Sequence, residues 1–216
     1  MQILVGGTAS NCVKLKFQEA LIDYELPIHE YTIYNHPQSM IGSTACAWEK
    51  SVWIDENNEW VKNSQNMLTY ILYHEVGHLK DNAFKKNELA QLQLSKAGYI
   101  KFRKESEFSA DRLACEQLLK KGQQGLIIIG QLLCGLSCAS LLNIKAGCGH
   151  ASAKQEYQTL VHFLKTKEYT VKSSYNKQPK FIVSTSLEGP GILGTMTFTF
   201  TPEASTGFVD WLTHLF

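Results

Sequence analysis

The feature that most constrains this chain is the run Tyr-His-Glu-Val-Gly-His at residues 73–78. Apolar residues recur around it every three or four positions, which predicts a helix with one buried face. On such a helix His74 and His78 lie on one side, one turn apart, so both imidazoles can reach a single ion. Glu75 is rotated off that line. Its carboxylate is therefore placed to take a proton from a metal-bound water.

A third ligand is required, because catalytic zinc uses three protein ligands and an open water position. His-Glu-x-x-His alone also arises by chance in about one to two per cent of chains of this length. The segment 105–114 is predicted to be helical and supplies Glu107, while Asp111, four residues later on the same face, can accept a hydrogen bond from a ligand histidine. Glu105 is a rival ligand. Its partner at the same spacing is Ser109, which orients an imidazole less well.

These two segments resemble the glutamate zincins (gluzincins), most closely the family of the CAAX prenyl protease and the HtpX heat-shock protease. The resemblance rests on His-Glu-x-x-His and, one helical hairpin later, Glu-Phe-x-Ala-Asp followed by Arg-Leu-Ala. The resemblance to this family is clear over residues 25–120. It implies that residues 28–34 form the strand before the site, that residues 42–48 lie where the family has its substrate-pairing edge strand, and that residues 52–55 lead into the catalytic helix.

Residues 43–48 and 51–55 are both predicted to be strands, and residues 29–34 alternate in the same way. A further short strand is predicted at residues 2–5, and a polar helix at residues 80–100. If residues 43–48 form an exposed edge over the metal, a peptide could pair with them in extended form and present one carbonyl group to the ion. The alternative is an ordinary hairpin strand.

Residues 150–157 resemble the His-Pro-x-x-x-x-Arg stretch of the same family, with Ala151 in place of the proline and Glu156 at the arginine position. On that resemblance His150 would donate a hydrogen bond to the oxyanion of the tetrahedral intermediate, a role worth about 3 kcal/mol. The alternative, a histidine in a loop or at a helix cap, is equally open.

We predict an α+β fold with a zincin-like metallopeptidase core, in which a small sheet packs on the catalytic helix and on a glutamate-bearing helix. This core would comprise residues 1–166. Three alternating stretches in residues 167–216 predict a small antiparallel β-rich C-terminal extension. The apolar run at residues 125–142 is just long enough to span a bilayer, but Gln131 and its many small residues favour a buried core helix over a membrane segment.

The net charge, the N-terminal sequence and the cysteine content limit the partners and the cellular compartment that we expect for this protein. The formal net charge is +1 and the basic residues are scattered, which argues against a nucleic-acid partner. The N-terminus lacks the pattern of a signal peptide, so we expect an intracellular, cytoplasmic protein. The six cysteines are expected to be free buried thiols, and a second metal cluster of Cys134, Cys138, Cys148 and His150 is disfavoured.

The function predicted from these residues is zinc-dependent endopeptidase activity on a protein or peptide substrate. One Zn²⁺ would bind His74, His78 and Glu107, with Asp111 orienting a histidine and Glu75 acting as general base. Three alternatives stay open: a zinc-binding regulatory or interaction protein without peptidase activity, a narrow-specificity peptidase that cleaves one regulatory partner, and a membrane-anchored protein held by residues 125–142. The substrate and the oligomeric state are not predicted.

Overall fold

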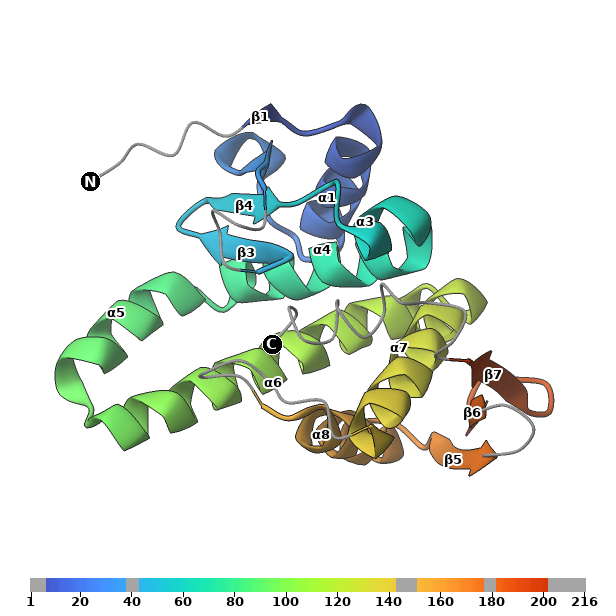
Figure 1. The fold of residues 1–216 in the computed structure, drawn as a ribbon. Helices are drawn as coiled ribbons and strands as arrows, with labels where there is room; N and C mark the ends of the chain where they lie inside the picture. The colour runs from blue at the N-terminus through green and yellow to red at the C-terminus, as the bar shows by residue number, and fades with distance from the viewer. Residues whose placement is uncertain (1–6, 38–42, 143–150, 177–181, 202–216) are drawn as a thin grey trace. The chain divides into compact units, whose positions relative to one another are not determined.

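The computed structural model describes residues 7–37, 43–142, 151–176 and 182–201. These residues form helices and two small sheets, so the chain is a mixed α+β protein, as predicted (Figure 1). The chain divides into two compact units. Unit 1 comprises residues 1–113 and 215, and unit 2 comprises residues 114–214 and 216.

Unit 1 contains a four-stranded sheet and the helices around it. Its described elements are β1 (Gly7–Thr8), α1 (Asn11–Asp23), the 3-10 helix η1 (Ile28–Glu30), β2 (Thr32–Asn35), β3 (Ala45–Trp48), β4 (Ser51–Ile54), α3 (Glu59–Asn63), α4 (Gln65–Lys80), α5 (Ala83–Gln93) and the part of α6 (Lys96–Lys120) that precedes residue 114. The strand order is β1-β2-β4-β3, with β2 and β4 parallel and the other neighbours antiparallel. In the part of the chain that the structure describes, β3 is therefore an edge strand paired only with β4.

The helix α4 carries the His-Glu-x-x-His motif through the interior of unit 1. Ser64 begins the helix by accepting a hydrogen bond from the backbone N–H of Met67 at 3.2 Å. Most α4 side chains are buried, and the helix packs against α1 and β3. This burial includes His74 and Glu75, which are only 8% and 7% exposed. Polar groups removed from water in this way need partners or a ligand.

The helices α4 and α6 approach each other closely at Gly77. A Cβ atom on Gly77 would lie 3.3 Å from the carbonyl oxygen of Ala110 and 3.4 Å from its Cα atom. Glycine thus allows the backbone of α6 to pass next to α4. The turn of α4 that carries both histidines consequently lies beside the turn of α6 that carries Glu107 and Asp111.

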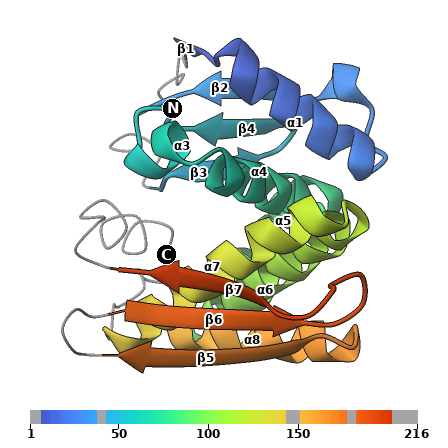
Figure 2. The ribbon, with the colours of Figure 1, turned by 90° about the vertical axis from the view of Figure 1, so that its right-hand side faces the viewer.

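Unit 2 is a three-stranded antiparallel sheet packed on helices (Figure 2). Its described elements are the end of α6, α7 (Gln123–Leu141), α8 (Ala153–Thr166), β5 (Thr170–Asn176), β6 (Ile182–Glu188) and β7 (Met196–Phe200). The strand order is β5-β6-β7; α7 packs against α8, β6 and β7. A Cβ atom on Gly130 of α7 would lie 2.0 Å from the ring of Phe198, so the glycine lets this ring pack directly on the helix.

Among the described helices, only α7 is long and apolar enough to cross a membrane. Its apolar window is 72% buried within the folded chain. Such burial is what the predicted core helix requires, because a helix that faces lipid would expose its apolar side chains.

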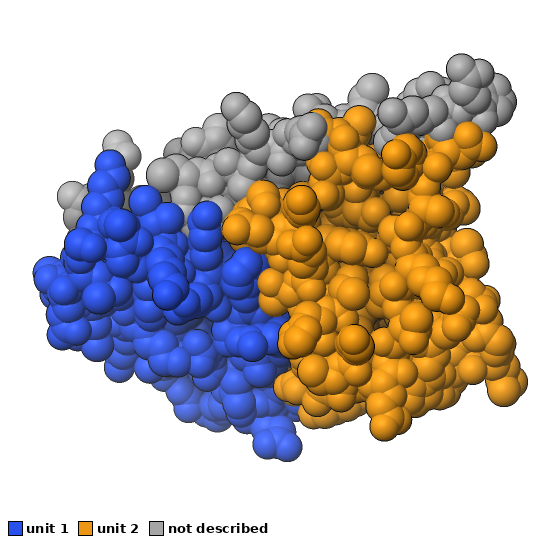
Figure 3. Space-filling model, turned by 90° about the horizontal axis from the view of Figure 1, so that it is seen from below, with its two compact units in different colours: residues 1–113, 215 blue, residues 114–214, 216 orange. Residues whose placement is uncertain are grey.

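The two units divide within α6, between residues 113 and 114, and they are coloured separately in Figure 3. The sequence predicted a boundary at residue 166 instead. In unit 2 the strands β5–β7 pack on α7 and α8 and group with these helices.

Several local predictions are corrected. The strand expected at residues 29–34 begins only at Thr32, because the backbone N–H of Glu30 bonds to the carbonyl oxygen of Pro27 and forms η1. The single helix expected at residues 80–100 is broken, since Asn82 has a left-handed backbone (φ 54°) between α4 and α5. Cys12 is free but exposed, not buried. The strand expected at residues 2–5, together with Cys148, lies outside the described residues.

Candidate metal centre

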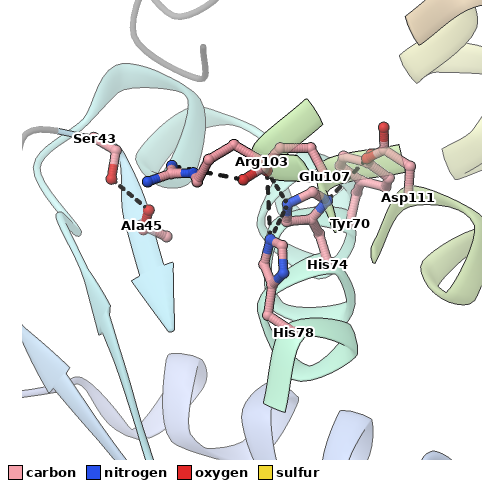
Figure 4. A network of polar contacts seen from close by, with 8 residues as sticks. All are labelled: Ser43, Ala45, Tyr70, His74, His78, Arg103, Glu107 and Asp111. Atoms are coloured by element: carbon pink, nitrogen blue, oxygen red, sulfur yellow. Dashed lines mark hydrogen bonds and ion pairs between the residues drawn. The ribbon is translucent and has the colours of Figure 1, made fainter. Parts of the chain in front are cut away.

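The structure brings His74, His78 and Glu107 together where α4 passes α6 (Figure 4). The Nε2 atoms of the two histidines are 3.1 Å apart. The Oε2 atom of Glu107 is 3.3 Å from Nε2 of His74 and 3.4 Å from Nε2 of His78. Ligand atoms at 2.0–2.1 Å from a tetrahedral ion are about 3.3 Å apart. These three side chains could therefore hold one metal ion.

Asp111 fixes the orientation of the His74 ring. Its Oδ1 atom lies 2.8 Å from Nδ1 of His74 and also accepts a hydrogen bond from the hydroxyl group of Tyr70. A carboxylate only accepts hydrogen bonds, so Nδ1 of His74 must carry the proton. Nε2, the nitrogen left to bind a metal ion, faces His78 and Glu107. Asp111 is only 5% exposed, which shields this hydrogen bond from water.

The charges of the centre in the metal-free chain favour a cation. Burial lowers the pKa of His74, but hydrogen bonds to Asp111 and Glu107 outweigh it and hold this pKa well above 6.5. Burial raises the pKa of Glu107, but His78 and His74 together hold it well below 4.5. A metal ion would therefore replace a proton that the same carboxylates hold on His74.

Glu75 provides an acceptor next to these side chains. Burial raises the pKa of its carboxyl group above 4.5, and this outweighs the opposing charges of His74 and His78. Its Oε2 atom is buried and has no hydrogen-bond partner among the described residues. Leaving a buried acceptor unpaired costs about 1–3 kcal/mol. A water bound to a metal ion here would supply the missing partner of this oxygen. The residues present therefore fit a metal ion that carries a bound water.

The strand β3 lies beside Glu75. A hydrogen bond from the backbone of Ala47 lowers the pKa of Glu75, and the charge of Glu75 adds to burial in raising the pKa of the Cys46 thiol to about 12. At the end of the strand Trp48 is 54% exposed, and its ring centroid lies 4.7 Å from that of Phe84. The predicted edge strand is thus at an edge of the described sheet and next to the candidate general base.

Two other predicted site residues, Glu105 and His150, are not part of the described cluster. Glu105, the rival ligand, is exposed and pairs with Lys101 at 3.8 Å, away from the histidines. His150 lies outside the described residues. The sequence interpretation missed Tyr70 and Arg103. The signal for both was present: each lies four residues before a predicted ligand on the same helix face.

Comparisons of the chain with protein-family models, with curated proteins and with solved structures found no match.

Proposed function

We propose that the chain is a zinc-dependent endopeptidase with His74, His78 and Glu107 as its metal ligands. The observation that carries the proposal is the spacing of 3.1–3.4 Å among these three ligand atoms. Glu75, whose charge interacts with those of His74 and His78, adds a buried oxygen that has no partner among the described residues. Two imidazoles and one carboxylate are a donor set of catalytic zinc, whereas Mg²⁺ and Ca²⁺ prefer oxygen ligands throughout. Three protein ligands also leave one tetrahedral position for water or substrate.

In the reaction that we propose, bound zinc would polarise the scissile carbonyl group and acidify a coordinated water. Glu75 takes the proton of this water while the water oxygen forms a bond to the carbonyl carbon. It then gives the proton to the nitrogen as the carbon–nitrogen bond breaks. The raised pKa of Glu75 suits both transfers, because a carboxyl group of ordinary pKa would be a weaker base at neutral pH. Asp111 and Tyr70 keep His74 in one orientation.

The strand β3, which among the described strands pairs only with β4, supports a peptide substrate. An extended peptide can add to such a strand through backbone hydrogen bonds, which suits many sequences and needs no single side chain. The same arrangement, with a histidine-bearing helix, a glutamate-bearing helix and an edge strand, supports a zincin-like core for unit 1.

Two variants test the proposal. Glu75→Gln should keep stoichiometric zinc and abolish peptide cleavage, measured with a peptide library and a proteome-wide cleavage screen. His74→Ala should lose zinc, measured by metal analysis of the purified chain. Glu105→Gln, an exposed glutamate on α6, is the matched control and should behave as the parent.

The proposal fails if Glu75→Gln cleaves as fast as the parent, or if His74→Ala retains stoichiometric zinc. Stoichiometric zinc in a parent chain that cleaves no peptide would indicate a zinc-binding protein without peptidase activity.

A further inference from the structure

Arg103 lies next to the candidate metal centre, where it contacts the ligand Glu107. Its Nη2 atom is 3.9 Å from Oε1 of Glu107, the carboxylate oxygen that does not face the histidines. This separation is longer than a hydrogen bond. The Nε atom is buried and has no hydrogen-bond partner among the described residues. A guanidinium group has five N–H donors, so the contact with Glu107 alone does not account for its placement.

A second pair on the same helix shows what an ordinary surface contact looks like. Lys101 and Glu105 have the same spacing of four residues and are 3.8 Å apart, but their side chains are 80% and 62% exposed. Arg103 is 34% exposed and Glu107 is 14% exposed. Arg103 is therefore partly withdrawn from water while a ligand can still reach it. Withdrawing a cation from water is costly unless an anionic group compensates.

The direction of the Arg103 side chain places it on the substrate side of the centre. Figure 4 shows the guanidinium group extended from α6 toward Ala45, the first residue of β3, and away from the ring of His74. A peptide paired with β3 would pass this position. The group that becomes negative during hydrolysis is the carbonyl oxygen of the bond that is cleaved.

We propose that Arg103 is a further catalytic residue, whose guanidinium group donates a hydrogen bond to the carbonyl oxygen of the scissile peptide bond. The inference rests on the proposed peptidase function. When the water oxygen bonds to the carbonyl carbon, the electron pair of the carbonyl double bond moves onto this oxygen, which becomes negatively charged. The cation therefore binds the tetrahedral intermediate more tightly than the substrate. When the carbon–nitrogen bond breaks, the electron pair returns to the carbonyl group and the charge is lost.

The test compares Arg103→Gln and Arg103→Lys with the matched control Lys101→Gln. For a peptide that the parent cleaves, Arg103→Gln should lower kcat by about 10²–10³-fold with little change in KM, as removal of one oxyanion donor does. Arg103→Lys should retain part of the activity. Lys101→Gln should match the parent. Zinc affinity, measured by competition with a chelator, should be the same in all four proteins.

A binding measurement gives a readout that does not depend on turnover. A phosphinic analogue of the cleaved peptide carries a tetrahedral, negatively charged centre in place of the scissile carbonyl group. Its affinity, measured by calorimetry, should fall in Arg103→Gln in parallel with kcat/KM, whereas the affinity of the product peptide that carries the new amino group, and so has no oxygen at this position, should not.

Two results would overturn the role of Arg103. Zinc affinity that falls in Arg103→Gln, with kcat restored by excess zinc, would show that Arg103 acts only by holding Glu107. A kcat within threefold of the parent would show that it takes no part in the reaction. Either result leaves the peptidase proposal standing as long as the parent cleaves and Glu75→Gln does not. A parent that cleaves no peptide is the separate failure of that proposal.

Discussion

Replacing Asp111 by asparagine should weaken zinc binding by about 10- to 100-fold, the usual effect of losing a partner behind a metal-ligating histidine. Asparagine keeps the size of the side chain and an oxygen that can accept from Nδ1 of His74, now at 2.8 Å. It removes the negative charge, which makes the imidazole a weaker ligand. The loss corresponds to about 1.4–2.8 kcal/mol of binding free energy.

Asp111→Ala separates orientation from charge. This variant also leaves the Nδ1–H group of His74 without its acceptor, and His74 is 8% exposed. A buried donor that loses its partner costs about 1–3 kcal/mol. The metal-free alanine variant should therefore have a lower free energy of unfolding in urea than the metal-free asparagine variant by about that amount.

Zinc affinity would be measured by competition with a chromophoric chelator at neutral pH. Asp81→Asn is a suitable control, because Asp81 is 34% exposed and pairs with Lys86 at the end of α4. An Asp111→Asn variant that binds zinc within twofold of the parent would refute the idea that Asp111 orients and polarises His74.

Three further outcomes are expected. At a pKa of about 12, only about 10⁻⁴ of the Cys46 thiol is ionised at pH 8. Iodoacetamide should therefore alkylate Cys46 roughly 10³-fold more slowly than an ordinary thiol. Mass spectrometry that finds Cys46 modified as early as the exposed Cys12 would contradict this prediction. Zinc affinity should fall about tenfold for each pH unit below the raised pKa of His74, because a proton then competes with zinc for the ring nitrogen. A zinc affinity that stays constant between pH 7 and pH 5 would count against this prediction. Ser64→Ala should lower the free energy of unfolding, measured in urea, by about 1 kcal/mol, because the hydrogen bond from the N–H of Met67 is lost. Its zinc affinity should be unchanged. Weaker zinc binding would mean that the helix cap also positions the histidines.

The ligand arrangement could be predicted from the sequence because it depends on helix periodicity. His74 and His78 are four residues apart, as are Glu107 and Asp111, and a helix places such pairs on one face whatever the rest of the chain does. The start of α4 at Ser64 and the end of α6 before Gly122 also follow from local signals. Which carboxylate faces the histidines follows from the same spacing.

Features that depend on contacts distant in sequence were not predictable. The hydrogen bond from the backbone of Ala47 to Glu75 joins residues of a strand and a helix, and neither sequence neighbourhood indicates it. The break at Asn82 was missed because asparagine also occurs within helices, and only its left-handed backbone shows that α4 ends there. The grouping of the β5–β7 sheet with α7 likewise depends on tertiary packing, including the fit of Phe198 against Gly130.

Gly77 contributes no ligand, yet it determines how wide the gap between the ligand-bearing helices can be. A methyl group there would meet the Ala110 backbone at 3.3 Å and force the helices apart by a few tenths of an ångström. That change is comparable to the difference in bond length between a small divalent ion and a larger one. Which ion this centre could hold is thus partly a matter of packing, and an engineer could adjust it at a position that carries no side chain.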